Sequence, residues 1–173
     1  MRIDIQFGII AGFATILCFT LEFVLGFHTT YLNIGKYTSY LSALIPVITV
    51  YMAIKRHYTR EEETFLTWRQ GLQFDTVIFF TGLLIFTIFF IIYCYFINPD
   101  WKNFLQKLTE QEIILSDMSE EQIEIRFHEF TEILYNPSQI WFRYIIGYFL
   151  GFLISLIVIL FLIKSNKFGL KRN

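Results

Sequence analysis

The sequence predicts an all-α membrane protein with four transmembrane helices and an extracytoplasmic amphipathic helical hairpin between the third and the fourth. Three observations predict this fold. First, 55% of the 173 residues are hydrophobic and only 17% are charged, whereas a typical soluble domain carries roughly 25% charged residues. Second, four apolar runs are long enough, or nearly so, to cross a bilayer. Third, lysine and arginine are distributed unevenly among the segments that connect these runs.

The four apolar runs define the predicted spans, which cover residues 7–27, 37–54, 77–97 and 141–163 of a single membrane domain, residues 1–173. At a helical rise of about 1.5 Å, about 20 residues cross a hydrocarbon core about 30 Å thick. The second run is the shortest. Pro46 in its middle predicts a kink, which a membrane helix tolerates where neighbours satisfy the freed carbonyl group. Cys18 and Cys94 lie inside apolar runs and are expected to behave as small hydrophobic residues.

The orientation of the spans follows from the basic residues. Nine of the 14 lysines and arginines fall in the N-terminus, in the loop over residues 55–75 and in the C-terminal tail. Because basic residues accumulate on the cytoplasmic side, we expect these segments to be cytoplasmic and residues 28–36 and 98–140 to be outside. Tryptophan favours the headgroup level, and all three lie beside predicted spans: Trp68, Trp101 and Trp141.

The cytoplasmic loop over residues 55–75 divides into two halves. Its first half mixes three glutamates with lysine and arginine and predicts a solvated face. Phe65, Trp68 and Leu72 follow at helical spacing. They predict an amphipathic helix that lies at the inner membrane interface.

The outer segment over residues 98–140 is the only extramembrane piece large enough to fold. Apolar residues recur at helical spacing from Trp101 to Leu108 and from Ile123 to Leu134, so we expect a hairpin of two helices. Ser119 and Gln122 have the spacing of a capping box. Nine acidic residues in the segment disfavour docking on anionic lipid, so either another protein covers its apolar stripe or the hairpin caps the bundle.

Short motifs beside the spans add a resemblance to a known family. They are Thr67-Trp68-Arg69-Gln70-Gly71-Leu72 before the third span, Asn98-Pro99-Asp100 after it, and Asn136-Pro137 before the fourth. With this order of spans, the chain resembles domain-of-unknown-function family 4199, small four-span membrane proteins of Bacteroidota. The resemblance covers nearly the whole chain. It implies a location in the bacterial inner (cytoplasmic) membrane, with both termini cytoplasmic by the basic-residue bias, and it implies no known activity.

Glu22 is the one carboxylate well inside a predicted span. An ionisable residue in a membrane is by default a functional candidate, because burying its charge costs at least a few kcal/mol. Glu22 lies near the predicted outer end of its span, at Phe27, so the alternative is that it reaches the interface or is simply neutral.

Two glycine pairs have the spacing that lets membrane helices approach closely. They are Gly8 with Gly12 in the first span and Gly147 with Gly151 in the fourth. Either they pack helices of one chain together or they join two copies in a homo-oligomer.

No catalytic, cofactor-binding or metal site is predicted. His28, His57 and His128 fall in three segments, two outside and one inside, so they cannot share a metal ion. No nucleophile elbow, phosphate loop or zinc-protease helix is present in the sequence. A net charge of -1 provides no basic excess for nucleic acid.

Two classes of function remain, and neither is an enzyme. The first is an accessory or assembly subunit of an inner-membrane complex, and the alternative is a small ion- or proton-coupled transporter. A transporter is expected to place polar groups near the bilayer midplane, whereas these spans are polar mainly at their ends, so the sequence favours the first class. Its expected partners are the lipid bilayer, another membrane or periplasmic protein through residues 98–140, and further copies of the chain.

Overall fold

The computed structural model describes residues 2–28, 31–61, 66–99 and 137–165, together with residues 103, 107, 119, 121, 122, 124 and 125. All regular elements among them are helical, which confirms the all-α class. They are α1 (Ile3–Val24), α2 (Leu32–Thr38), the 3₁₀ helix η1 (Ser39–Ala43), α3 (Leu44–Glu61), α4 (Trp68–Ile92), the π-helix η2 (Tyr93–Ile97) and α7 (Pro137–Ser165). The chain divides into two compact units: Met1–Thr87 with Tyr144–Asn173, and Ile88–Arg143.

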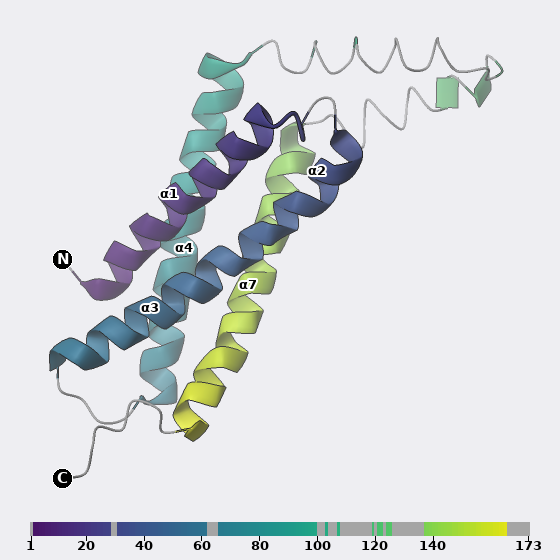
Figure 1. The fold of residues 1–173 in the computed structure, drawn as a ribbon. Helices are drawn as coiled ribbons and strands as arrows, with labels where there is room; N and C mark the ends of the chain where they lie inside the picture. The colour runs from purple at the N-terminus through teal and green to yellow at the C-terminus, as the bar shows by residue number, and fades with distance from the viewer. Residues whose placement is uncertain are drawn as a thin grey trace. The chain divides into compact units, whose positions relative to one another are not determined.

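The first unit is a bundle of α1, α3, α4 and α7 (Figure 1), and the first glycine pair brings α1 against α4. A β-carbon added at Gly8 would lie 2.6 Å from Cβ of Thr81, and one at Gly12 would lie 2.7 Å from Cβ of Ile85. A side chain at either position would therefore force the two helices apart.

The second glycine pair joins α7 to η1 and to the start of α3. A side chain at Gly147 would meet the hydroxyl of Ser42, and one at Gly151 would meet the carbonyl oxygen of Ala43 and the ring of Pro46. The predicted close approach is therefore confirmed at both pairs, and the contacts are made within the chain. Association of two copies remains a prediction.

Contacts between α4 and α7, and between α1 and α3, complete the bundle. Gly71 of α4 lies against the side chain of Ile159, and a β-carbon at Gly82 would lie 2.6 Å from the hydroxyl oxygen of Tyr148. α3 packs along α1. Each of the four helices thus packs against at least two of the others.

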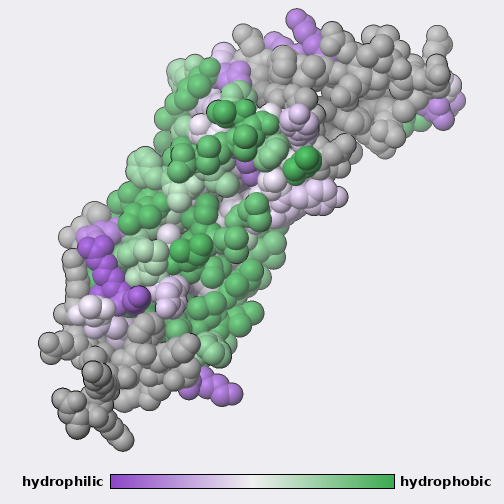
Figure 2. Space-filling model, in the orientation of Figure 1, coloured by the Kyte–Doolittle hydropathy of each residue, from purple (hydrophilic) through white to green (hydrophobic). Residues whose placement is uncertain are grey.

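Apolar side chains fill most of the core of the bundle and also cover its outside. Large exposed apolar residues follow the outer face of each helix: Phe13, Leu17 and Leu21 on α1, Leu44, Ile48 and Met52 on α3, Phe80 and Leu84 on α4, and Leu153 and Ile157 on α7. On the face drawn in Figure 2, hydrophobic residues cover the middle of the bundle, and hydrophilic ones gather near its lower end, where α1 begins and α3 ends. Such large contiguous apolar faces are rare in soluble proteins and typical of lipid-facing surfaces.

Among the described residues, three helical stretches are long and apolar enough to cross a membrane: Ile3–Val24, Trp68–Ile97 and Ile140–Lys164. They correspond to the first, third and fourth predicted spans. The second predicted span, residues 37–54, is divided among α2, η1 and α3 and stays a prediction. The expected disturbance at Pro46 takes the form of the 3₁₀ turn that precedes α3. Because proline has no N–H, the residues before it can tighten into a 3₁₀ turn without losing a helical bond there.

The start of α4 corrects the prediction for the loop over residues 55–75. Trp68 and Leu72 belong to α4 itself and not to a separate amphipathic helix, and Phe65 lies outside the described residues. The N–H of Thr67 donates to Oε1 of Gln70 at 3.0 Å, and the N–H of Gln70 donates to Oγ1 of Thr67 at 3.3 Å. This capping box starts the helix well before Val77. Asp75, which the sequence assigned to the loop, therefore lies two turns inside a helix.

In the second unit, α4 ends in η2, where the N–H of Asn98 donates to the carbonyl oxygen of Tyr93 at 2.8 Å. Ser119 and Gln122 form the predicted capping box: the N–H of Ser119 donates to Oε1 of Gln122 at 3.3 Å, and the N–H of Gln122 donates to Oγ of Ser119 at 3.4 Å. Most residues of the predicted hairpin over 98–140 lie outside the described residues. α7 begins at Pro137, a residue type that suits the first helical position.

Candidate functional site in the bundle interior

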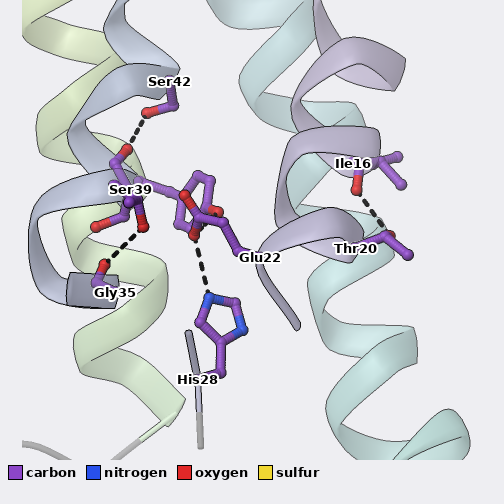
Figure 3. A network of polar contacts seen from close by, with 9 residues as sticks. Ile16, Thr20, Glu22, His28, Gly35, Ser39 and Ser42 are labelled. Carbon is purple, nitrogen blue, oxygen red and sulfur yellow. Dashed lines mark hydrogen bonds and ion pairs between the residues drawn. The ribbon is translucent and has the colours of Figure 1, made fainter. Parts of the chain in front are cut away.

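Glu22 is held inside the bundle by two polar side chains. Only 4% of its surface is exposed. The hydroxyl of Tyr144 donates to its Oε2 at 2.6 Å, and Nε2 of His28 lies 3.2 Å from the same oxygen. Figure 3 shows the carboxyl group of Glu22 and the ring of His28 facing each other. The side chain of Glu22 therefore points into the bundle and not towards its outer surface.

The end of α1 explains how His28 reaches Glu22. Gly26 has φ 77°, a left-handed conformation that glycine adopts without steric cost. The N–H of Gly26 donates to the carbonyl oxygen of Phe23 at 3.0 Å, and the N–H of Phe27 donates to that of Glu22 at 2.9 Å. These two bonds form a Schellman motif, which reverses the chain. The first helix therefore ends at Val24 rather than at the predicted Phe27, and His28 folds back beneath Glu22.

Aromatic rings enclose this polar group. The ring centroid of Phe19 lies 4.9 Å from that of His28 and 5.7 Å from that of Tyr144. The ring centroid of Phe86 on α4 lies 4.8 Å from that of Tyr144 and 6.0 Å from that of Phe19. The apolar enclosure weakens competition from water, so hydrogen bonds to Glu22 are stronger than they would be at the surface.

A second polar contact lies one turn further along α7, at Tyr148. The hydroxyl oxygens of Thr15 and Tyr148 are 3.1 Å apart, and both side chains are fully buried. Thr15 Oγ1 also lies 2.9 Å from the carbonyl oxygen of Ala11. The contact joins α1 to α7 away from the ends of both helices.

A third polar contact joins α7 to α4. Oγ of Ser155 lies 2.6 Å from Oδ1 of Asp75 and 2.8 Å from the carbonyl oxygen of Phe152. Asp75 is 0% exposed, and its Oδ2 has no hydrogen-bond partner among the described residues. The sequence does not single out this buried carboxylate because the apolar run begins after it. The capping pair Thr67 and Gln70 is the signal that could have placed it in a helix.

The three contacts occupy one face of α7. Tyr144, Tyr148 and Ser155 are separated by four and seven residues, which are whole turns of an α-helix to within a fraction of a turn. At about 1.5 Å per residue, the three levels are about 6 Å and about 10 Å apart. Polar groups therefore occur at several depths, which corrects the expectation that the spans are polar mainly at their ends.

Two of the three histidines, His28 and His57, lie among the described residues. His28 lies at Glu22, whereas His57 on α3 packs its ring against Phe74, with centroids 5.2 Å apart. His128 lies outside the described residues. Within the described part of the chain, no three of the histidine, cysteine, aspartate and glutamate side chains come together as a metal site.

An apolar exterior and hydrogen-bonded polar side chains in the interior define the class: a multi-pass integral membrane protein built as a helical bundle. The chain belongs to the family described as protein of unknown function (DUF4199), whose model matches residues 6–164. This match confirms the resemblance drawn from the motifs. No curated protein and no solved structure matches the sequence.

The stretch from Thr67 to Leu72, at the start of α4, has a structural role in this bundle. Thr67 and Gln70 cap the helix, and Gly71 provides the close contact with Ile159 on α7. The motif therefore fixes where α4 begins and how it packs.

Proposed function

We propose that the protein spans the bacterial inner membrane four times, with both termini in the cytoplasm, and that its polar interior takes part in proton-coupled transport. Glu22 and its two partners carry this proposal. A buried carboxylate is costly, and a neutral side chain would hold the helices together equally well. A group that exchanges protons with its surroundings, by contrast, must be ionisable.

The geometry at Glu22 supports proton exchange. Oε2 receives the hydroxyl of Tyr144 and faces Nε2 of His28. Nδ1 of His28 is buried and has no hydrogen-bond partner among the described residues. Histidine can bind a proton at one ring nitrogen while the other faces a carboxylate, which is the arrangement used in proton relays.

Helix α3 supplies the fourth span in this proposal. Residues 32–61 are helical throughout, and at about 1.5 Å per residue they reach about 45 Å, longer than a hydrocarbon core of about 30 Å. Leu44, Ile48 and Met52 give α3 an exposed apolar face like those of the other three helices. Lys55 and Arg56 follow this face and fit the cytoplasmic side.

Proton flux into vesicles tests the proposed function. Purified protein in liposomes with a pH-sensitive dye inside should dissipate an imposed pH gradient faster than protein-free liposomes do. The gradient is imposed with potassium and valinomycin present, so that charge compensation does not limit the rate. Equal rates in the two preparations would contradict a proton pathway through the polar interior.

The second candidate is an accessory or assembly subunit, also without enzymatic activity. Its supporting observation is the exposed apolar row Tyr95, Phe96 and Ile97 on η2, directly before the segment predicted to bind a partner. Purification from native membranes in mild detergent discriminates between the two. A stoichiometric partner that is lost when residues 98–140 are replaced by a short linker, together with absent proton flux, would favour this candidate.

A further inference from the structure

We propose that Asp75 is a second proton-binding site and that its carboxyl group holds a proton in the folded protein. The proton belongs to the hydrogen bond between Asp75 on α4 and Ser155 on α7. This inference deepens the proposed function by adding a site on the cytoplasmic half of the bundle. The presence of the proton rests on the local geometry, and its part in transport rests on the proposed function.

The hydrogen bonds of Ser155 indicate that Asp75 is protonated. A serine hydroxyl has one hydrogen to donate. Oγ of Ser155 nevertheless lies within hydrogen-bond distance of two acceptors, Oδ1 of Asp75 at 2.6 Å and the carbonyl oxygen of Phe152 at 2.8 Å. If Asp75 were ionised, one hydrogen would have to serve both acceptors.

A proton on Asp75 satisfies both contacts at once. The carboxylic acid donates from Oδ1 to Oγ of Ser155, and Ser155 donates its own hydrogen to the carbonyl oxygen of Phe152. Both distances suit O–H···O hydrogen bonds. Backward donation of this kind, to a carbonyl three or four residues earlier, is common for serine in helices.

The surroundings of Asp75 are the second argument. The side chain is 0% exposed, and Phe74 and Ile78, which flank it on α4, belong to the apolar core together with Ile159 of α7. The unpartnered oxygen Oδ2 is tolerated far better as a neutral carbonyl oxygen than as half of a carboxylate. The ion pairs found among the described residues are Arg2 with Asp4 and His28 with Glu22, so no cation there compensates Asp75.

Other titratable groups lie on the helices around Asp75. Asp4 is paired with Arg2 at the start of α1, and the ring of His57 on α3 packs against Phe74. Further titratable groups on these helices are Lys55, Arg56 and Tyr58 on α3, Arg69 at the start of α4, and Tyr148 and Lys164 on α7. Asp75 lies seven residues after Trp68, about 10 Å into the helix from its predicted cytoplasmic end. A proton there is reached from the side of the membrane opposite to Glu22.

Infrared spectroscopy of the protein in lipid at neutral pH tests this inference, because a protonated carboxyl group has a C=O stretching band distinct from those of a carboxylate. Asp75→Asn should remove one such band. Ser155→Ala should keep the band but move it to higher frequency, since one hydrogen bond to the acid is lost. Ser155→Thr, which keeps the hydroxyl, should restore the original position. Glu22→Gln serves as the matched control and should leave the band of Asp75 unchanged.

Three outcomes would overturn the inference: a spectrum in which neither Asp75→Asn nor Ser155→Ala alters a carboxylic acid band, a band that appears only in acid, or a band that disappears when sodium is added at constant pH. The last would identify a cation site instead. If Asp75→Asn fails to fold, the Ser155 pair still decides the question. A band without proton flux would refute the proposed function alone, and flux without the band would refute only the second site.

Discussion

Gly151→Ile should destabilise the folded bundle by about 3 kcal/mol, the upper end of the usual range for overpacking. A side chain at this position would meet the carbonyl oxygen of Ala43 and the ring of Pro46. Neither atom can turn away as the end of a flexible side chain would, so α7 and α3 must separate. The effect is measured as a lower unfolding temperature in detergent, where unfolding is detected by the loss of the monodisperse species.

The matched control for this variant is Leu150→Ile, on the neighbouring exposed position of α7. It introduces the same side chain on the lipid-facing side and should leave the unfolding temperature nearly unchanged. Gly12→Ile should behave like Gly151→Ile, because the added side chain would meet Ile85. If both glycine variants unfold like the wild type, the glycine faces are directed towards lipid and the packing described above is incorrect.

Glu22→Gln should reduce proton flux to the rate of protein-free liposomes while the protein stays folded. The amide has nearly the size of the carboxyl group, and its oxygen can still accept the hydroxyl of Tyr144, which donates to Glu22 at 2.6 Å. It cannot take up or release a proton at neutral pH. This variant therefore removes proton exchange at residue 22 while it keeps the hydrogen bond that holds the helices together.

Two further variants make this test specific. Glu22→Asp keeps an ionisable group and should retain part of the flux. Tyr144→Phe removes one hydrogen bond but no carboxylate, so flux should persist with an altered pH dependence. Wild-type flux in Glu22→Gln would show that this residue has only a structural role.

The spans that carry long apolar runs could be predicted from the sequence, because the cost of exposing backbone groups to lipid makes helices the only choice there. The ends of these helices do not follow from hydropathy. Gly26 and the pair Thr67 and Gln70 set the ends of α1 and α4 by local hydrogen bonds. A hydropathy profile contains no information on these hydrogen bonds, although glycine after a helix and a Thr-x-x-Gln sequence before one are typical of helix ends.

The partners of the buried carboxylates could not be predicted. Glu22 and Tyr144 are 122 residues apart, and Asp75 and Ser155 are 80 apart. Their contacts depend on which helix faces meet, and a single sequence does not determine that. Glu22 was identified because it interrupts an apolar run, whereas Asp75 escaped notice because it precedes one.

The sidedness of the two termini tests the account most directly, because the four-span bundle is the frame for both buried carboxylates. Reporters at the N-terminus and after Asn173 should both lie in the cytoplasm, and a tag inserted near Ser116 should lie outside. If α3 did not cross the membrane, the three remaining spans would place the two termini on opposite sides. Termini on opposite sides would therefore contradict the four-span bundle, and with it the assignment of Glu22 and Asp75 to opposite halves of the membrane.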